Sequence, residues 1–322
     1  LYRKRLDAFI LDAHYKTYIL HANSALELAR FSDISEIKIA NVNDYEVVSA
    51  YKLIPLNIRL YGLKSLNKIA GKIRARFHEK KVLSRVDVVV ANSVYTSEKI
   101  KNGYGLKNVK TIYKSCDVSL FKRESEVTAE PNSFLFVGND WRRKGLVALI
   151  DAFSIIKKKG FRDAKLTIVG IPSRDYDEVS KIAKDLRVSS SVSIYGNMGR
   201  DDLVKMYNQN CFLVMPSYVE ALGISILEAM SCGLLVAVAD RGGMPEIIDD
   251  GVSGFIFQDP TPKSISETLI KMMDLTDFEK SNILTESDNT LRYFNSTRMI
   301  NEIRGLYRDL FETREIDENC IK

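Results

Sequence analysis

The chain has 322 residues and a formal net charge of +5, with 45% hydrophobic and 28% charged residues. This length predicts two domains of ordinary size, and the composition is typical of a globular protein with well-filled cores. No apolar run is long enough to span a bilayer, and the acidic residues Asp7 and Asp12 exclude a signal peptide at the start. The four cysteines show no metal-ligand spacing and are typical of a reducing compartment, so a cytoplasmic location is predicted. The mild positive charge, without aromatic residues between basic ones, does not indicate a nucleic-acid partner.

The first half of the chain holds few strand candidates, which are the apolar segments 6–11, 36–42, 86–92 and 108–113. Between the second and third candidates, a long helix is predicted from Leu63 to Leu83. One face of this helix carries basic residues at four-residue spacing, namely Lys64, Lys68, Lys72, Arg76 and Lys80. The stripe fits either an ordinary amphipathic helix packed on its domain or peripheral attachment to anionic lipid.

A polar, proline-bearing segment at 122–133 indicates a linker, and a regular pattern follows it. Apolar strands are predicted at 133–139, 164–170, 191–197, 211–217 and 234–240. Amphipathic helices are predicted at 146–159, 177–186, 200–209 and 264–273, and one long terminal helix at 290–312. This alternation predicts a parallel, doubly wound sheet, in which ligands bind at the carboxyl ends of the strands.

The segment PSYVEALGISILEAMSCG, residues 216–233, places two glutamates eight positions apart across a predicted helix start. If the helix begins at Gly223-Ile224, its unpaired N–H groups form an anion site suited to phosphate. Glu220 then precedes the helix and Glu228 lies about one turn inside it. Because an ionised carboxylate accepts two hydroxyl donors at once, the order carboxylate, amides, carboxylate matches the sugar, diphosphate and ribose of a nucleotide sugar. By spacing alone, the two glutamates also fit a solvated helix face.

Two further strand ends favour the binding site. FVGNDWRRKG places Arg143 and Lys144 where cations can meet a diphosphate, and GGMPE at 242–246 is a glycine turn that permits close approach to a ligand. With Pro216-Ser217, these motifs resemble the retaining glycosyltransferases of glycosyltransferase family 4, of the group 1 type, over nearly all of residues 133–257. The resemblance implies the α/β fold called GT-B, in which two Rossmann-like, doubly wound domains face a cleft.

The expected domains are an acceptor-side domain at 1–128, a nucleotide-sugar-binding domain at 129–289, and a terminal helix at 290–322 that crosses back to the first domain. The N-terminal domain is expected to be shortened, because four strand candidates precede the linker whereas a dinucleotide-type half has about six.

The resemblance also implies a role for each matching residue. The catalytic group would be Glu220 near the reacting end of the sugar, with Arg143 and Lys144 neutralising the diphosphate. Glu228 would bind the ribose of the donor, and backbone around Asn197 and Met198 would contact the base. The other donor-binding residues would lie in the loops around the phosphates, namely Leu222, Gly223, Ile224, Ser225 and Gly138. The acceptor side would hold His14, Asn43 and Asp44.

The activity implied is hexosyl transfer with retention, from a nucleotide-diphosphate sugar to a glycan or lipid-linked acceptor, in polysaccharide or glycolipid biosynthesis. No cofactor and no obligatory metal are expected. Asn43 stands where the family has a histidine, so the alternative is a nucleotide-sugar-binding protein of the same fold with weak or no transfer. A sugar-nucleotide epimerase is a second alternative, but no added acid–base cluster supports it. The D-x-D sequence at 175–177 is interpreted as helix capping rather than as a metal motif.

Overall fold

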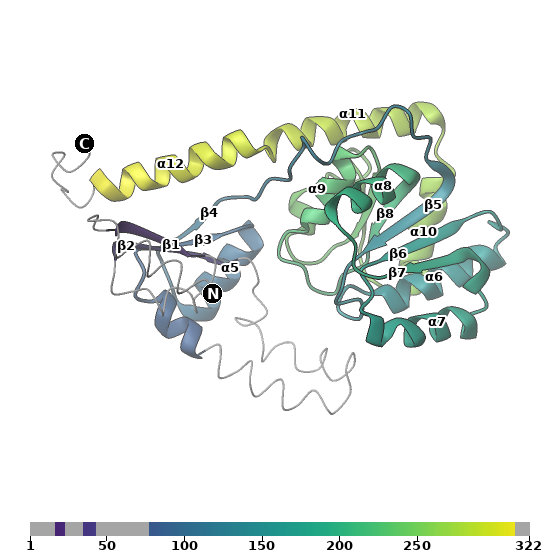
Figure 1. Cartoon of the computed structure of the whole chain (residues 1–322), viewed down its shortest axis with the longest axis horizontal. Helices are drawn as coiled ribbons and strands as arrows, with labels where there is room; N and C mark the ends of the chain where they lie inside the picture. The colour runs from purple at the N-terminus through teal and green to yellow at the C-terminus, as the bar shows by residue number, and fades with distance from the viewer. Residues whose placement is uncertain (1–16, 23–34, 43–76, 313–322) are drawn as a thin grey trace.

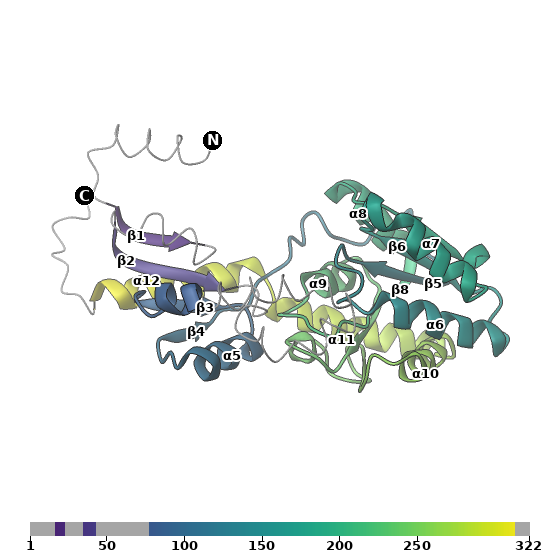
Figure 2. The same ribbon diagram turned by 90° about the horizontal axis from the view of Figure 1, so that it is seen from below.

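The computed structural model describes residues 17–22, 35–42 and 77–312, which form two lobes, each built on a parallel sheet (Figure 1). Two long helices at the end of the chain run along one side of both lobes. They are drawn in yellow-green and yellow, and the view from below shows the same two-lobed arrangement (Figure 2).

The first sheet has the order β1-β2-β3-β4 with every described pair parallel. Its strands are β1 (Thr17–Ala22), β2 (Ser35–Val42), β3 (Val88–Ala91) and β4 (Val109–Thr111). Three of them confirm predicted strands. The sequence analysis did not predict β1, which is only six residues long and follows an equally apolar run at 6–11 that lies outside the described residues.

Helix α5 (Val94–Tyr104) connects β3 to β4. Its first turn is capped by Ser93, whose side chain accepts a hydrogen bond from Thr96 N, and it ends at Gly105 in the left-handed region. Residues 77–83 are helical and belong to the predicted basic helix, of which 63–76 lie outside the described residues.

The second sheet has the order β10-β9-β8-β5-β6-β7, and all its pairs are parallel. The strands are β5 (Glu130–Val137), β6 (Lys165–Val169), β7 (Val192–Tyr195), β8 (Asn210–Met215), β9 (Leu235–Ala239) and β10 (Phe255–Phe257). If these six strands are numbered by their order in the chain, their order across the sheet from β7 to β10 is 3-2-1-4-5-6. This is the doubly wound arrangement that was predicted. The direction of winding therefore reverses between β5 and β8, where ligands bind in such sheets.

Helices follow these strands at nearly the predicted positions. They are α6 (Leu146–Lys158), α7 (Tyr176–Asp185), α8 (Arg200–Gln209), α9 (Ile224–Ser231) and α10 (Pro262–Met273), with short 3₁₀ turns η2 (Ser173–Asp175), η3 (Ser189–Ser191) and η4 (Met244–Glu246). Helix α10 packs against α6, and helix α11 (Asp277–Tyr293) packs against α9. Because the inner strands are covered by helices, β9 is buried at all five positions.

The terminal helix predicted at 290–312 is confirmed from residue 296 to residue 312, but its predicted start is wrong, because a separate helix that was not predicted ends at residue 293. Helix α11 (Asp277–Tyr293) begins with a capping box between Thr276 and Glu279, and α12 (Ser296–Glu312) follows it. Phe294 interrupts the helix and is 2% exposed, and the Asn295 side chain accepts from Arg298 N at 2.8 Å. A buried aromatic residue followed by an asparagine cap thus ends one helix and starts the next.

Helix α12 lies against the first sheet, although α11 belongs to the second lobe (Figures 1 and 2). Leu306 is buried in a cluster with Ile39, Val90 and Ile112 from the first sheet and the segment after it. The end of the described chain therefore bridges the two lobes by burying apolar surface on both.

Candidate functional site

Three strand ends with glycine lie side by side at the carboxyl edge of the second sheet. Gly138 N donates to Val169 O at 2.9 Å, and Gly170 N lies 3.1 Å from Gly196 O. A side chain at Gly170 would meet the Gly138 carbonyl carbon at 3.0 Å, so the two loops touch through their backbones. The loops after β5, β6 and β7 therefore form one continuous rim.

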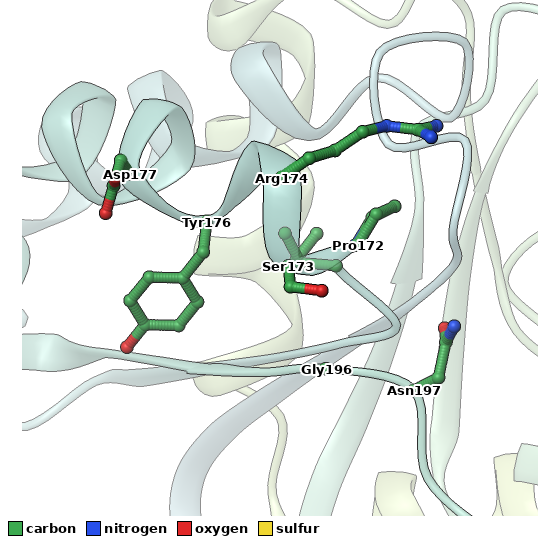
Figure 3. Close-up of a pocket in the computed structure, with 8 residues that line it drawn as sticks. Pro172, Ser173, Arg174, Tyr176, Asp177, Gly196 and Asn197 are labelled. Atoms are coloured by element: carbon green, nitrogen blue, oxygen red, sulfur yellow. The ribbon is translucent and has the colours of Figure 1, made fainter.

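A cavity of about 750 Å³ opens on this rim beside β6 and β7 (Figure 3). Asn197 rises from one loop toward the segment that carries Pro172 and Ser173 on the other (Figure 3). The cavity is lined by Ile171, Pro172, Ser173, Arg174, Tyr176, Asp177, Gly196 and Asn197. Of the two residues predicted near the base, Asn197 thus lines the cavity, whereas Met198 packs partly buried on the core.

Lys144 lies over Gly138 and reaches toward Glu220. A side chain at Gly138 would meet Lys144 Cδ at 2.3 Å, so only glycine leaves room for the lysine stem. The Lys144 ammonium is 3.5 Å from Glu220 Oε2, and the two side chains are 15% and 16% exposed. Glu220 Oε2 is buried, and the 3.5 Å that separates it from the ammonium is typical of an ion pair but long for a hydrogen bond. Among the described residues, Oε2 therefore accepts no close hydrogen bond.

Arg143 is engaged differently from Lys144. Its guanidinium donates to Asp140 Oδ2 at 3.0 Å and to Val219 O at 2.7 Å, and its own carbonyl accepts from Tyr218 N. These contacts tie the loop after β5 to the loop after β8. A contact between Arg143 and a diphosphate stays a prediction.

The loop after β8 confirms the predicted helix start. Gly223, with φ of 97°, is the N-cap of α9, and the helix begins at Ile224. Leu222 is buried, while Ile224 and Ser225 are half-buried. The first N–H groups of α9 therefore point out of the helix beside Glu220, whose Cγ lies 3.6 Å from where a side chain at Gly223 would begin.

Glu228 lies on α9, half-buried, with Tyr207 donating to its Oε2 at 2.9 Å. Burial raises the pKa of Glu228 above its ordinary value, while the Tyr207 hydroxyl and the charges of Arg200 and Lys144 lower it in part. Burial and the same carboxylate hold the pKa of Tyr207 well above its usual range, so Tyr207 stays a donor. One carboxylate oxygen is thereby fixed, and Oε1 has no donor among the described residues.

The D-x-D segment does not cap α7 as interpreted from the sequence. Asp175 occupies the cap position but makes no side-chain capping bond, and its Oδ2 instead accepts from the Trp141 indole at 3.1 Å. Asp177 does lie in the first turn of α7, where a negative charge complements the helix dipole. Within ranges 17–22, 35–42 and 77–312, no three His, Cys, Asp or Glu side chains gather in a manner that could hold a metal ion.

The predicted acceptor-side residues His14, Asn43 and Asp44 lie outside the described residues. The structure adds residue roles that the sequence analysis did not assign. Tyr207 and Arg200 surround Glu228, and Ser93 and Glu246 join the site to the first lobe. These contacts span 21 to 152 positions in the chain, so spacing alone could not reveal them.

A model of the family described as glycosyl transferases group 1 matches residues 117–287, which is more than half of the chain. The chain belongs to the group 1 glycosyl transferases. A curated relative, D-inositol 3-phosphate glycosyltransferase 1 of Catenulispora acidiphila, is 27% identical over 213 residues, or 61% of this chain and 51% of the relative. This group 1 glycosyl transferase chain thus spans about half the length of curated relatives that it matches.

Solved structures confirm the predicted GT-B fold for this group 1 glycosyl transferase. Sucrose-phosphate synthase from Thermosynechococcus elongatus superimposes with a TM-score of 0.79 at 17% identity, covering 96% of this chain and 77% of its own. Anabaena HepE, solved in complex with UDP-glucose, gives a TM-score of 0.74 at 18% identity, covering 90% and 78% respectively. At such identities the likeness establishes the fold, while the substrates need separate evidence.

No helix in the described ranges has both the length and the apolar character needed to cross a membrane.

Proposed function

We propose that this chain carries a retaining glycosyltransferase activity of family 4, which moves a hexosyl group from a nucleotide-diphosphate sugar to a glycan or lipid-linked acceptor. Residues 129–289 form the donor side in this proposal, residues 1–128 the acceptor side, and 290–322 the return to the first lobe. The relatives that match are longer than the matched region, so the activity of the whole protein is part of the proposal.

The observation that carries the proposal is the buried Oε2 of Glu220, whose ion-pair partner, the Lys144 ammonium, lies 3.5 Å away, so that this oxygen accepts no close hydrogen bond among the described residues. The ion pair offsets part of the free-energy cost of burying this charge, and a close hydrogen bond to Oε2 would stabilise it further. Sugar hydroxyls are donors that satisfy such an oxygen, and Glu220 lies at the mouth of an anion-binding helix start. A ligand that carries both hydroxyl groups and negative charge therefore suits this site.

The diphosphate belongs between Lys144 and the first N–H groups of α9. The ammonium supplies a positive charge, and the amides of Ile224 and Ser225 supply fixed donors at the positive end of the helix dipole. In the proposed reaction, the bond from the anomeric carbon to the diphosphate oxygen breaks, and the acceptor hydroxyl oxygen bonds to the same face of that carbon. The diphosphate leaves with the bonding electron pair, which Lys144 and the amides stabilise, and its departing oxygen takes up the proton of the acceptor hydroxyl.

The nucleoside belongs between Glu228 and the cavity at β6 and β7. Oε1 of Glu228 can accept from ribose hydroxyls, while Tyr207 holds Oε2. The cavity of about 750 Å³ is large enough for a nucleobase, and Asn197 on its rim offers polar contacts. The fold neighbour HepE, with UDP-glucose bound, supports a nucleotide-sugar donor of this kind.

One sequence feature favours the alternative of nucleotide-sugar binding with weak or no transfer, namely Asn43 in the position where the resemblance calls for histidine. Thermal unfolding in the presence of UDP-, GDP- and ADP-sugars tests donor binding, and sugar-nucleotide consumption with glycan or lipid acceptors tests transfer. A donor that raises the melting temperature without any transfer supports the alternative, and no binding at all contradicts both.

Because cationic side chains take the role of a metal in the proposal, turnover should persist in EDTA. A loss of turnover that magnesium or manganese restores would overturn metal independence.

Donor binding should weaken as pH falls, and at a higher pH than an ordinary glutamate would produce. The pKa of Glu228 in the free protein is raised by burial, and only its ionised form accepts both ribose hydroxyl bonds. Affinity is therefore full above the raised pKa and is lost as pH falls through it. Dissociation constants of a nucleotide sugar between pH 8 and pH 5 measure this, since its doubly esterified diphosphate does not titrate there. Glu228→Gln should bind more weakly at pH 8 and lose this pH dependence; an unchanged profile would contradict the assignment.

Peripheral attachment to the cytoplasmic face of a membrane is the remaining part of the proposal. It is motivated by the basic stripe, of which Lys80 lies exposed in the described part of the helix, and by Phe77 nearby on the same helix, which is 71% exposed. We expect co-sedimentation with vesicles that contain anionic lipid and little with neutral vesicles, because the attraction is electrostatic. Equal binding to both kinds of vesicle, or binding that resists high salt, would contradict it.

A further inference from the structure

Glu246 joins the two lobes through three hydrogen bonds. It closes the glycine turn after β9 in the second lobe, yet its carboxylate caps α5 of the first lobe. Oε2 accepts from Val94 N at 2.8 Å and Oε1 from Tyr95 N at 2.7 Å. Oε2 also accepts from the Tyr113 hydroxyl at 2.8 Å, and burial together with this carboxylate raises the pKa of Tyr113. A negative charge on the first N–H groups of α5 is placed where the helix dipole stabilises it most.

The same glycine turn holds the loop of Glu220. Gly243 N donates to Glu220 O at 3.1 Å, and a side chain at Gly242 would meet that oxygen at 1.8 Å. At Gly243 a side chain would meet Ala221 O at 2.1 Å. The turn therefore packs backbone to backbone on the glutamate loop, and Glu246 follows three positions later.

The first lobe also grips the glutamate loop directly. Ser93, the cap of α5, donates its hydroxyl to Ala221 O at 2.6 Å. Val219 and Ala221 are buried in the hydrophobic cluster of the first lobe, with Val89 and Ile100. Residues 219 and 221 thus face the first sheet, while Glu220 between them pairs with Lys144 of the second lobe.

We propose that Glu246 is a positioning residue, which locks α5 onto the glycine turn and so fixes Glu220 only when the two lobes are in this arrangement. The inference rests on the proposed function for the role of Glu220. When the lobes separate, the bonds of Glu246 to α5 break together with the Ser93–Ala221 bond, and the glutamate loop loses its support from the first lobe. Donor binding stays, because Lys144, the start of α9 and Glu228 all belong to the second lobe.

The test compares Glu246→Gln with wild type. The carboxamide offers one acceptor oxygen, and its NH₂ group faces a backbone N–H, so the lock is weakened without a change in size. We expect a kcat lower by about tenfold or more, with a donor Kd within about threefold, as for an interaction that matters in the transition state. We also expect a larger radius of gyration by small-angle X-ray scattering, since the lobes separate more often. Tyr113→Phe, which removes one of the three donors, should show smaller effects of the same kind.

Glu267 on α10 is exposed and serves as the matched control. Glu267→Gln should leave kcat, the donor Kd and the radius of gyration unchanged. An unchanged radius of gyration and kcat in Glu246→Gln would overturn the proposal. A donor Kd that rises as much as kcat falls would also overturn it, by showing damage to the second lobe itself. The scattering measurement needs no activity, so it tests the lock even if the chain binds no nucleotide sugar and the proposed function fails.

Discussion

Replacing Lys144 with methionine should lower kcat by about 10²–10³-fold, the loss typical of removing one preorganised charge-stabilising group. Methionine keeps the apolar stem that lies over Gly138 but removes the ammonium near Glu220 and the proposed diphosphate. The effect falls on turnover because negative charge on the diphosphate grows as the bond to the sugar breaks. Release of nucleoside diphosphate under saturating donor measures it.

Lys158→Met is the matched control, since Lys158 lies exposed on the following helix and should be dispensable. A kcat for Lys144→Met within about threefold of wild type would contradict the assigned role. A fall in donor affinity with kcat unchanged would also contradict it, because the ammonium would then bind ground state and transition state equally.

The second lobe could be predicted closely because buried parallel strands are almost wholly apolar and their helices have a clear period. The runs around Leu235–Ala239 and Phe134–Val137 have no other stable place than the middle of a covered sheet. The helix start at Gly223 was predictable for a similar reason, since a glycine cap between a strand end and a helix is a local signal.

Predictions failed where tertiary contacts override local preference. The break between α11 and α12 depends on Phe294, which is buried beside Tyr113 from a distant segment, and no local signal fixes that contact. Asp175 has the composition of a cap, but the Trp141 indole needs an acceptor and takes its carboxylate. A propensity is a weak guide once a buried donor competes for the same side chain.

The candidate site shows the same division. The spacing of Glu220 and Glu228 marks them as a pair, but spacing could not show that Glu220 pairs with Lys144 at 3.5 Å while Glu228 is held by Tyr207. The role of Glu246 is still less visible, because its partner N–H groups lie 151 and 152 positions earlier in the chain. The roles of Glu220 and Glu228 depend on contacts within the second lobe, whereas that of Glu246 depends on the meeting of the two lobes.

The Lys144–Glu220 ion pair should lower the free energy of unfolding but support sugar transfer. Single and double variants of the two residues separate these two effects. Breaking a fully buried ion pair by removing one partner costs about 3–5 kcal/mol, because the other charge is left without compensation. These side chains are 15% and 16% exposed, so each single variant, Lys144→Met and Glu220→Met, should lose somewhat less. Replacing both charges by apolar groups of similar volume is often neutral or stabilising by about 1–4 kcal/mol.

The double variant should therefore unfold at a denaturant midpoint equal to or above that of wild type, while both singles unfold earlier. Its turnover should be as low as that of either single variant, since residues that act as a unit are not additive in kcat. As a control, the pair Lys205–Asp202 is 2.9 Å apart but 61% exposed at both side chains, and its removal should change stability by less than about 1 kcal/mol. A double variant less stable than both singles would mean that the pair holds the fold together. A double variant with wild-type turnover would mean that neither charge takes part in transfer.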